Sequence, residues 1–397
     1  MSKMKFWMFA AALCGLFWAC CPAKSQELLL GDQQFERYLP LLEGKRVALF
    51  SNQTGLAGEK HILDCLIERG VNVTAIFSPE HGFRGKADAG ELVSSSVDPA
   101  TGVPILSLYG SHGENRPSAE SMATFDILVA DIQDVGLRFY TYYITLCNLT
   151  DACAASGKPI VLLDRPNPNG HYVDGPILDM SLRSGVGALP IPVVHGLTLG
   201  ELLLMARGEG WLKEGNKADI TVIPCQGYTH QTHYSLPVAP SPNLPNMQSI
   251  YLYPALCPFE GTVVSLGRGT PKPFQQYGHP DMGAKYCYSF TPVSVPGATN
   301  PPLKDKLCYG VDLSEMPWED IWEKGLDLSY VIDAYTTLKD AGKAEGFFRR
   351  FFDLLLGQTY VREMILAGAS AQEIKARWAP DVEAFKKQRK PYLLYEE

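Results

Sequence analysis

A carboxylate, an imidazole and a guanidinium follow one another closely in residues 78–85 (SPEHGFRG). This segment comes directly after an apolar run at residues 71–77, which has the composition of a buried strand. Charged side chains are rarely buried without partners, so Glu80, His81 and Arg84 are not expected to serve as core residues at a strand end. We therefore predict that they contribute to a functional site.

Polar loops also follow three other predicted strands. Turn geometry alone favours Asn, Asp, Gly and Pro in any one of these loops. However, the carboxyl ends of parallel strands converge at one edge of a sheet, and four such loops at one edge favour a functional cleft. The predicted contributors are Asn52 after the first strand, Asp131, Asp134, Arg138 and Tyr140 after the fourth, and Asp164 and Arg165 after the fifth.

The scaffold expected beneath these loops is a parallel sheet. From about residue 45, short apolar runs alternate with amphipathic stretches, a pattern typical of βαβ units. Thr198 and Glu201 have the spacing of a helix capping box. The sequence predicts strands at residues 46–50, 71–77, 103–108, 125–130, 159–163 and 220–223, and helices at 61–68, 143–155 and 198–207.

The domain organisation follows from composition along the chain. Four prolines between residues 237 and 245 interrupt regular structure and indicate a boundary. Beyond them the sequence predicts a strand at 285–290 and helices at 328–341 and 371–378. We predict an α/β protein, with a Rossmann-like catalytic domain at residues 26–235 followed by a smaller α+β domain at residues 236–397.

The first residues predict export. Two lysines precede an apolar run at residues 6–20, and residues 23–25 (AKS) place small residues at the −3 and −1 positions of a cleavage site. The run is shorter than the ~20 residues of a spanning helix, so residues 1–25 are interpreted as a signal peptide. Cys20 and Cys21 leave lipid attachment open. The predicted location is the periplasm or the outer membrane.

Several functional classes lack support. The net charge is −8 with no basic cluster, which argues against nucleic acid as a partner. No glycine-rich nucleotide motif and no G-x-S-x-G motif occurs, so neither a nucleotide cofactor nor a serine hydrolase is predicted. His230 and His233 form a bare pair, and the seven cysteines after the leader show no C-x-x-C spacing. We predict no cofactor and no metal.

What remains is carboxylate chemistry. Glycosidases usually place two acids across the bond they cleave. Glu80 is the expected proton donor, because Phe77 and Phe83 could desolvate it and raise its pKa. His195 could face the cleft or be structural, and the alternative role of Asp134 and Asp164 is an ion pair with Arg138 or Arg165, or a turn hydrogen bond. The second acid stays open among Asp131, Asp134, Asp164 and Glu260.

Five ordered blocks resemble the exo-β-N-acetylmuramidases of the NamZ type, from about residue 41 to the C-terminus. They are SPEHGFRG at 78–85, DIQDVG with RFYT at 131–141, DRPNP at 164–168, SPNLP at 241–245, and FEGT with GRGT at 259–270. The chain departs from the family pattern at Lys272 and at residues 278–281, which puts the rim of the sugar pocket in doubt.

The resemblance implies an enzyme that removes N-acetylmuramic acid from the non-reducing end of peptidoglycan fragments, in a cleft between the two domains. It implies Glu80 as general acid/base, with Asp131 or Asp134 as the second group. Asn243, Glu260 and Arg268 would join the substrate site. Arg84, Arg138 or Arg268 would bind the lactyl carboxylate, with Arg268 preferred. Two alternatives are a non-catalytic muropeptide- or sugar-binding lipoprotein and a metal-dependent hydrolase.

Overall fold

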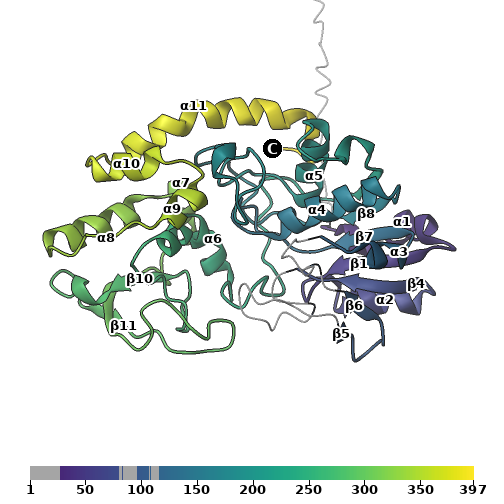
Figure 1. Cartoon of the computed structure of the whole chain (residues 1–397), viewed down its shortest axis with the longest axis horizontal. Helices are drawn as coiled ribbons and strands as arrows, with labels where there is room; N and C mark the ends of the chain where they lie inside the picture. The colour runs from purple at the N-terminus through teal and green to yellow at the C-terminus, as the bar shows by residue number, and fades with distance from the viewer. Residues whose placement is uncertain (1–26, 80–82, 84–95, 107, 109–115) are drawn as a thin grey trace, which may run out of the picture.

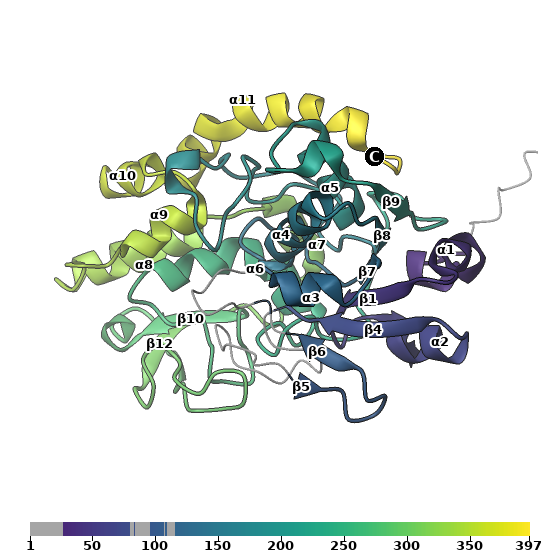
Figure 2. The same ribbon diagram turned by 45° about the vertical axis from the view of Figure 1, so that its right-hand side comes forward.

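A seven-stranded sheet forms the centre of the N-terminal half in the computed structural model, which describes residues 27–79, 83, 96–106, 108 and 116–397. The strand order is β5-β6-β4-β1-β7-β8-β9 (Figure 2). All neighbouring strands are parallel except β5, which pairs antiparallel with β6 at the edge. The strands are β1 (Arg46–Ser51), β4 (Asn72–Phe77), β5 (Ser96–Val97), β6 (Pro104–Leu106), β7 (Ile127–Asp131), β8 (Ile160–Leu163) and β9 (Ile220–Ile223).

Helices cover both faces of this sheet, so its strands are apolar on both sides. In β1, Val47 and Leu49 pack against the helices of one face, and Ala48 and Phe50 against those of the other. The first face is covered by α1 (Phe35–Leu42) and α2 (Ile62–Glu68), and the second by α3 (Ala119–Ala123), α4 (Tyr142–Ala155) and α5 (Leu199–Gly208). The parallel strands follow the Rossmann order, so the Rossmann-like class predicted from the sequence is confirmed.

The C-terminal half is smaller and carries an antiparallel sheet of order β10-β12-β11 with several helices. Its strands are β10 (Gln276–His279), β11 (Tyr288–Phe290) and β12 (Cys308–Asp312). The first half contains a separate hairpin of β2 (Leu56–Ala57) and β3 (Lys60–His61). Its helices are α6 (Met247–Leu256), α7 (Trp318–Lys324), α8 (Ser329–Asp340), α9 (Arg350–Leu356), α10 (Tyr360–Leu366) and α11 (Ala371–Arg389). Short 3₁₀ helices are η1 (Gly31–Gln33), η2 (Met180–Leu182), η3 (Gly215–Lys217), η4 (Cys257–Gly261), η5 (Pro280–Met282) and η6 (Lys390–Tyr392).

The last helix returns across the first half, as Figure 1 shows for α11 above α5. Trp378 Nε1 donates to Asp174 Oδ1 at 2.9 Å, and the Tyr395 hydroxyl donates to Asp164 Oδ2 at 2.6 Å. The predicted end of this helix at residue 378 is wrong, because α11 continues through Pro380 to Arg389. Burial of Phe385 and Arg389 against the first half compensates for the hydrogen bond that proline removes.

The two halves share one hydrophobic core, which includes side chains of α4 and α5 as well as α6, α8 and α9. The boundary at residue 235 stays a prediction. No helix among the residues that the structure describes is both long and apolar enough to cross a membrane. The seven cysteines at positions 65 to 308 have free thiols, and all but Cys287 are buried, as expected for small apolar side chains.

Candidate active site

Three of the four predicted loops meet at the carboxyl edge of the sheet. The chain reverses its strand order between β1 and β7, and this switch point is where open α/β sheets bind ligands. The backbone N–H of Gln133 donates to Thr54 Oγ1 at 3.0 Å, which joins the loops after these two strands. The Gln133 side chain donates to the Pro166 carbonyl in the loop after β8 at 2.8 Å. Glu80, His81 and Arg84 lie outside the described residues.

Asp131 and Arg165 form a buried ion pair at this edge. Arg165 Nε lies 2.6 Å from Asp131 Oδ1, and Arg165 Nη2 lies 3.0 Å from Asp131 Oδ2 and 2.6 Å from Asp32 Oδ2. All three side chains are at most 3% exposed. Burial, together with the charge of Asp131, raises the pKa of Asp32 to about 7. This triad holds η1 against the loops after β7 and β8, so its geometry supports a structural role for Asp131 and Arg165 and not the predicted contact with substrate.

Arg165→Gln is expected to destabilise the protein by roughly 3–5 kcal/mol, because it leaves two carboxylates buried without their cation. The loss should be largest above pH 7, where Asp32 is ionised, and shrink as the pH falls below 7 and Asp32 takes up a proton. Urea denaturation at several pH values measures this. Arg46→Gln is the matched control, since its partner Asp126 is exposed, and only a slight change is expected. Equal stability of Arg165→Gln and wild type at pH 8 would contradict the assignment.

Asp164 supports the start of α5. Its carboxylate accepts hydrogen bonds from Thr198 Oγ1 at 2.7 Å, the Gly200 N–H at 2.9 Å and the Tyr395 hydroxyl at 2.6 Å. Burial raises the pKa of Asp164 to about 6, although these hydrogen bonds act to lower it. The capping box predicted at Thr198 and Glu201 is present. Asp164 therefore lacks an oxygen directed at a ligand.

Arg138 and His195 are also buried away from the cavity described below. Arg138 donates from Nη1 to the carbonyls of Pro176 at 2.7 Å and Ile191 at 2.8 Å, and from Nη2 to the carbonyl of Leu355 at 2.9 Å. It thereby joins the first half to α9, and its geometry does not support substrate binding. His195 is 1% exposed, and burial lowers its pKa to about 3, so the ring is neutral at physiological pH.

Asp134 keeps one carboxylate oxygen without a hydrogen-bond partner among the described residues, as Asp32 does with its Oδ1. Oδ1 accepts the Gly136 N–H at 2.7 Å, whereas Oδ2 is buried and has no hydrogen-bond partner among the described residues. Burial raises the pKa of Asp134 to about 7. A buried carboxyl group with an open oxygen at a switch point is a candidate for proton transfer at neutral pH.

Asn52 connects the sheet edge to the proline-rich crossing segment. Its Nδ2 donates to the Tyr142 hydroxyl at 3.2 Å. The hydroxyls of Tyr140 and Tyr142 each donate to the Pro240 carbonyl at 2.9 Å. Asn52 therefore does not line the cavity itself but holds Tyr142, which does. Tyr140 lines the cavity as well.

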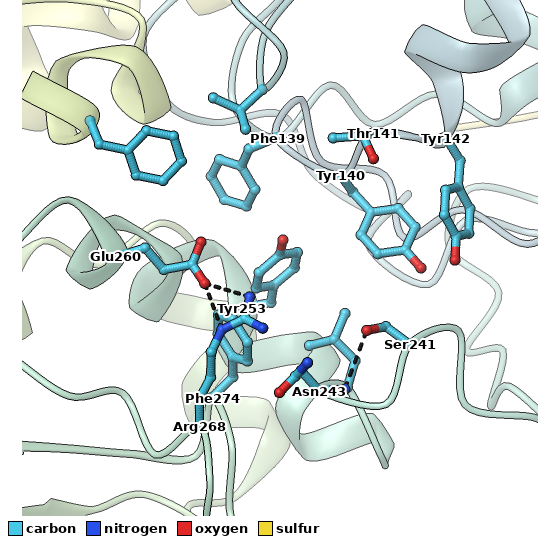
Figure 3. A pocket seen from close by; sticks show the side chains of 13 residues that line it. Phe139, Tyr140, Thr141, Tyr142, Ser241, Asn243, Tyr253, Glu260, Arg268 and Phe274 are labelled. Atoms are coloured by element: carbon cyan, nitrogen blue, oxygen red, sulfur yellow. Dashed lines mark hydrogen bonds and ion pairs between the residues drawn. The ribbon is translucent and has the colours of Figure 1, made fainter. Parts of the chain in front are cut away.

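A cavity of about 290 Å³ lies between the two halves (Figure 3). Five residues of the first half line it, together with three from the proline-rich crossing and five from beyond it. The predicted site residues Tyr140, Asn243, Glu260 and Arg268 are brought together here. The other lining residues are Phe139, Thr141, Tyr142, Val186, Ser241, Leu244, Tyr253, Phe274 and Phe351.

The cavity combines aromatic walls with a few polar groups, the composition expected of a small-molecule site. Glu260 and Arg268 form an ion pair in which Arg268 Nε lies 2.7 Å from Glu260 Oε1. Asn243 Nδ2 donates to the Gly297 carbonyl at 2.9 Å. Aromatic faces beside an amide and an ion pair suit an amphipathic, hydroxylated ligand such as a sugar.

Comparison with known proteins identifies the family. The model of the N-terminal part of exo-β-N-acetylmuramidase NamZ matches residues 47–248, and that of its C-terminal part matches residues 251–395. The chain belongs to the NamZ exo-β-N-acetylmuramidase family. It is therefore a glycoside hydrolase.

Individual NamZ relatives cover nearly the whole chain. It is 36% identical to the peptidoglycan β-N-acetylmuramidase NamZ of Bacillus subtilis strain 168, over 94% of this chain and 92% of that protein. A crystal structure of a DUF1343 family protein from Bacteroides fragilis NCTC 9343 is similar with a TM-score of 0.86 and 60% identity, covering 94% of this chain and all of that one. A second DUF1343 protein from the same strain has a TM-score of 0.78 and 27% identity, covering 93% and 99%.

Sequence reasoning missed several residues of this NamZ-family site. Tyr253 and Phe351 lie in apolar helices whose pattern resembles ordinary core. Asp32, which supports the site from outside the cavity through the Arg165 triad, follows no motif. Phe139 and Ser241 stand inside blocks that resemble the family, so these blocks were the signal that could have found them. No cluster of three or more potential metal ligands occurs among the described residues.

Proposed function

We propose that this enzyme is an exo-acting β-N-acetylmuramidase that releases terminal N-acetylmuramic acid from the non-reducing end of peptidoglycan fragments. The cavity between the halves carries the proposal: its volume of about 290 Å³ lies at the lower end for ligand sites and suits a single sugar residue. A site of that size favours removal of one terminal unit over cleavage within a long chain. The peptidoglycan activity of the Bacillus subtilis relative supports the same substrate class.

In the proposed mechanism, Glu80 protonates the leaving glycosidic oxygen. Glu80 follows β4 in the sequence, and β4 is the neighbour of β1 at the edge that carries Asn52. Asp134 is the preferred second group, because its Oδ2 is unused whereas both oxygens of Asp131 bind Arg165. Because its Oδ2 is buried and Asp134 does not line the cavity, it would act from behind the cavity wall, as a stabiliser of attack by the 2-acetamido group of the substrate.

Hydrolysis of para-nitrophenyl β-N-acetylmuramide tests the proposal. We expect release of nitrophenol by the wild type, with activity unchanged after prolonged chelation. No release by a folded wild-type protein would contradict it. Tight binding of an intact disaccharide without turnover would support the sugar-binding alternative, which membership of a hydrolase family does not favour.

We further propose that the chain is exported, on the basis of the leader-like residues 1–25. Mass spectrometry of protein from the native envelope should find a mature N-terminus near residue 26, or a lipid-modified cysteine at position 20 or 21. An intact Met1 on the mature protein would contradict export by this leader.

A further inference from the structure

Six aromatic side chains from four segments of the chain contact one another away from the cavity between the halves. The ring centroids of Trp318 and Trp322, both in α7, lie 4.6 Å apart, and the His233 ring lies 4.1 Å from that of Trp322. Tyr251 of α6 contacts Trp322, whereas Tyr253, on another face of the same helix, lines the cavity. The aromatic patch comprises His171, Tyr172, His233, Tyr251, Trp318 and Trp322.

The aromatic patch differs from ordinary core in exposure and in hydrogen bonding. None of its six side chains is fully buried, and Trp318 is 40% exposed. Trp322 Nε1 and His171 Nε2 are enclosed by protein but have no hydrogen-bond partner among the described residues. Indole and imidazole nitrogens in a packed core usually have one. Stability of the fold therefore does not account for this cluster, and an exposed patch of this kind indicates a binding surface.

A second cavity continues from the aromatic patch into the space between α7 and α11. Tyr172 and Trp322 belong to both, and Trp378 of α11 adds a third ring to the cavity wall. Its volume is about 290 Å³, the same as that of the cavity between the halves, and is enough for a single sugar residue. The aromatic patch and this second cavity thus form one extended surface, which suits a chain-shaped ligand.

The charges at the second cavity favour a neutral, hydroxylated ligand. Lys375 lies 2.7 Å from Asp174, and Lys386 lies 2.7 Å from Glu383. Four of the five charged side chains that line the cavity are therefore paired. Burial lowers the pKa of His171 to about 4, so this ring is neutral at physiological pH. Paired charges offer hydrogen-bond donors and acceptors to hydroxyl groups without selecting an ionic ligand.

We propose that the aromatic patch and the second cavity form an additional carbohydrate site, which binds a glycan chain away from the catalytic cavity. Sugar rings present apolar C–H faces that pack on aromatic side chains, and hydroxyl groups that bind polar ones. Binding here would hold the enzyme on polymeric peptidoglycan and raise the local concentration of chain ends at the catalytic cavity. This consequence rests on the proposed function, whereas the binding itself does not.

Calorimetric titration with a hexamer of N-acetylglucosamine tests the inference, because this chain has no N-acetylmuramic acid for the enzyme to release. The wild type should bind the hexamer, and excess free N-acetylmuramic acid should not displace it. Trp318→Ala should weaken binding at least about tenfold, as expected for an aromatic anchor, and Trp318→Phe should keep part of the affinity. Leu366→Ala removes a similarly exposed side chain of α10 outside the patch and should bind as wild type.

Kinetics distinguish this site from the catalytic cavity. Trp318→Ala should hydrolyse the nitrophenyl muramide as wild type does, and should show a raised KM with unchanged kcat on long peptidoglycan chains. Absence of hexamer binding by the wild type, or equal binding by Trp318→Ala, would overturn the inference. Loss of nitrophenyl muramide hydrolysis in folded Trp318→Ala would overturn it as well. Hexamer binding by a wild type that releases no nitrophenol would support the inference and count against the proposed function.

Discussion

Glu80→Gln is expected to lower kcat about 10³-fold on a disaccharide with N-acetylmuramic acid at its non-reducing end. The reason is that a sugar alkoxide is a poor leaving group, and proton donation by a positioned carboxyl group contributes about 10²–10⁴-fold. The loss should be smaller on the nitrophenyl muramide, since nitrophenolate leaves readily without a proton. Steady-state kinetics with both substrates measures the difference.

If the loss of kcat in Glu80→Gln depends on the leaving group, Glu80 is the proton donor; a loss measured on one substrate alone would show only that Glu80 is needed. Glu80→Asp is a useful second variant, because it keeps the carboxyl group and displaces it by one methylene. Equal losses on the two substrates would argue against proton donation, and unchanged activity of Glu80→Gln would remove Glu80 from the mechanism. Melting curves of each variant show whether the fold is retained.

Asp134→Asn should lower kcat at least about 100-fold and at the same time stabilise the protein at neutral pH. The amide keeps the shape of the side chain but can neither carry a charge nor transfer a proton. Asp131→Asn is the matched control from the same loop: it weakens the ion pair with Arg165 and should lower stability. Opposite changes in stability from two neighbouring Asp→Asn variants would distinguish the functional acid from the structural one.

The pH dependence of the Asp134 effect has a defined sign. Burial raises the pKa of Asp134 from 3.8 to about 7, so between these pH values the folded form retains a proton that the unfolded form has lost. The free energy of unfolding that depends on Asp134 therefore falls as the pH rises from about 4 to 7 and stays constant above 7. The Tm of Asp134→Asn should exceed that of wild type above pH 7, and the gain should vanish near pH 4. A variant less stable than wild type at pH 8 would contradict the assignment.

The parallel sheet could be predicted because its strands are short apolar runs separated by amphipathic helices. β1, β4, β7, β8 and β9 lie close to their predicted positions. The small C-terminal sheet was largely missed, since β10 (QYGH) and β12 (CYGVD) mix glycine with polar residues and have no clear period. The length of α11 was missed because Pro380 is a local stop signal that packing of the following turns overrides.

The site was predictable to the level of loops, but not of side-chain partners. Asp131, Asp134, Asp164 and Arg165 do lie at or just after strand ends, yet the sequence does not reveal that Asp131 and Arg165 bind each other. Their third partner, Asp32, lies some hundred residues earlier in the chain, in η1. Likewise, the sequence around Arg138 does not reveal that its side chain reaches the Leu355 carbonyl in α9. Such pairing is decided by tertiary packing.

The most direct test of the central claim follows the products from a defined peptidoglycan oligosaccharide that begins with N-acetylmuramic acid at its non-reducing end. Chromatography over time should show free N-acetylmuramic acid as the first product, with the rest of the chain shortened by one sugar. A matched chain capped with N-acetylglucosamine at that end should remain intact. Internal cleavage of either chain, or release from the capped one alone, would contradict the claim that this enzyme is an exo-acting muramidase.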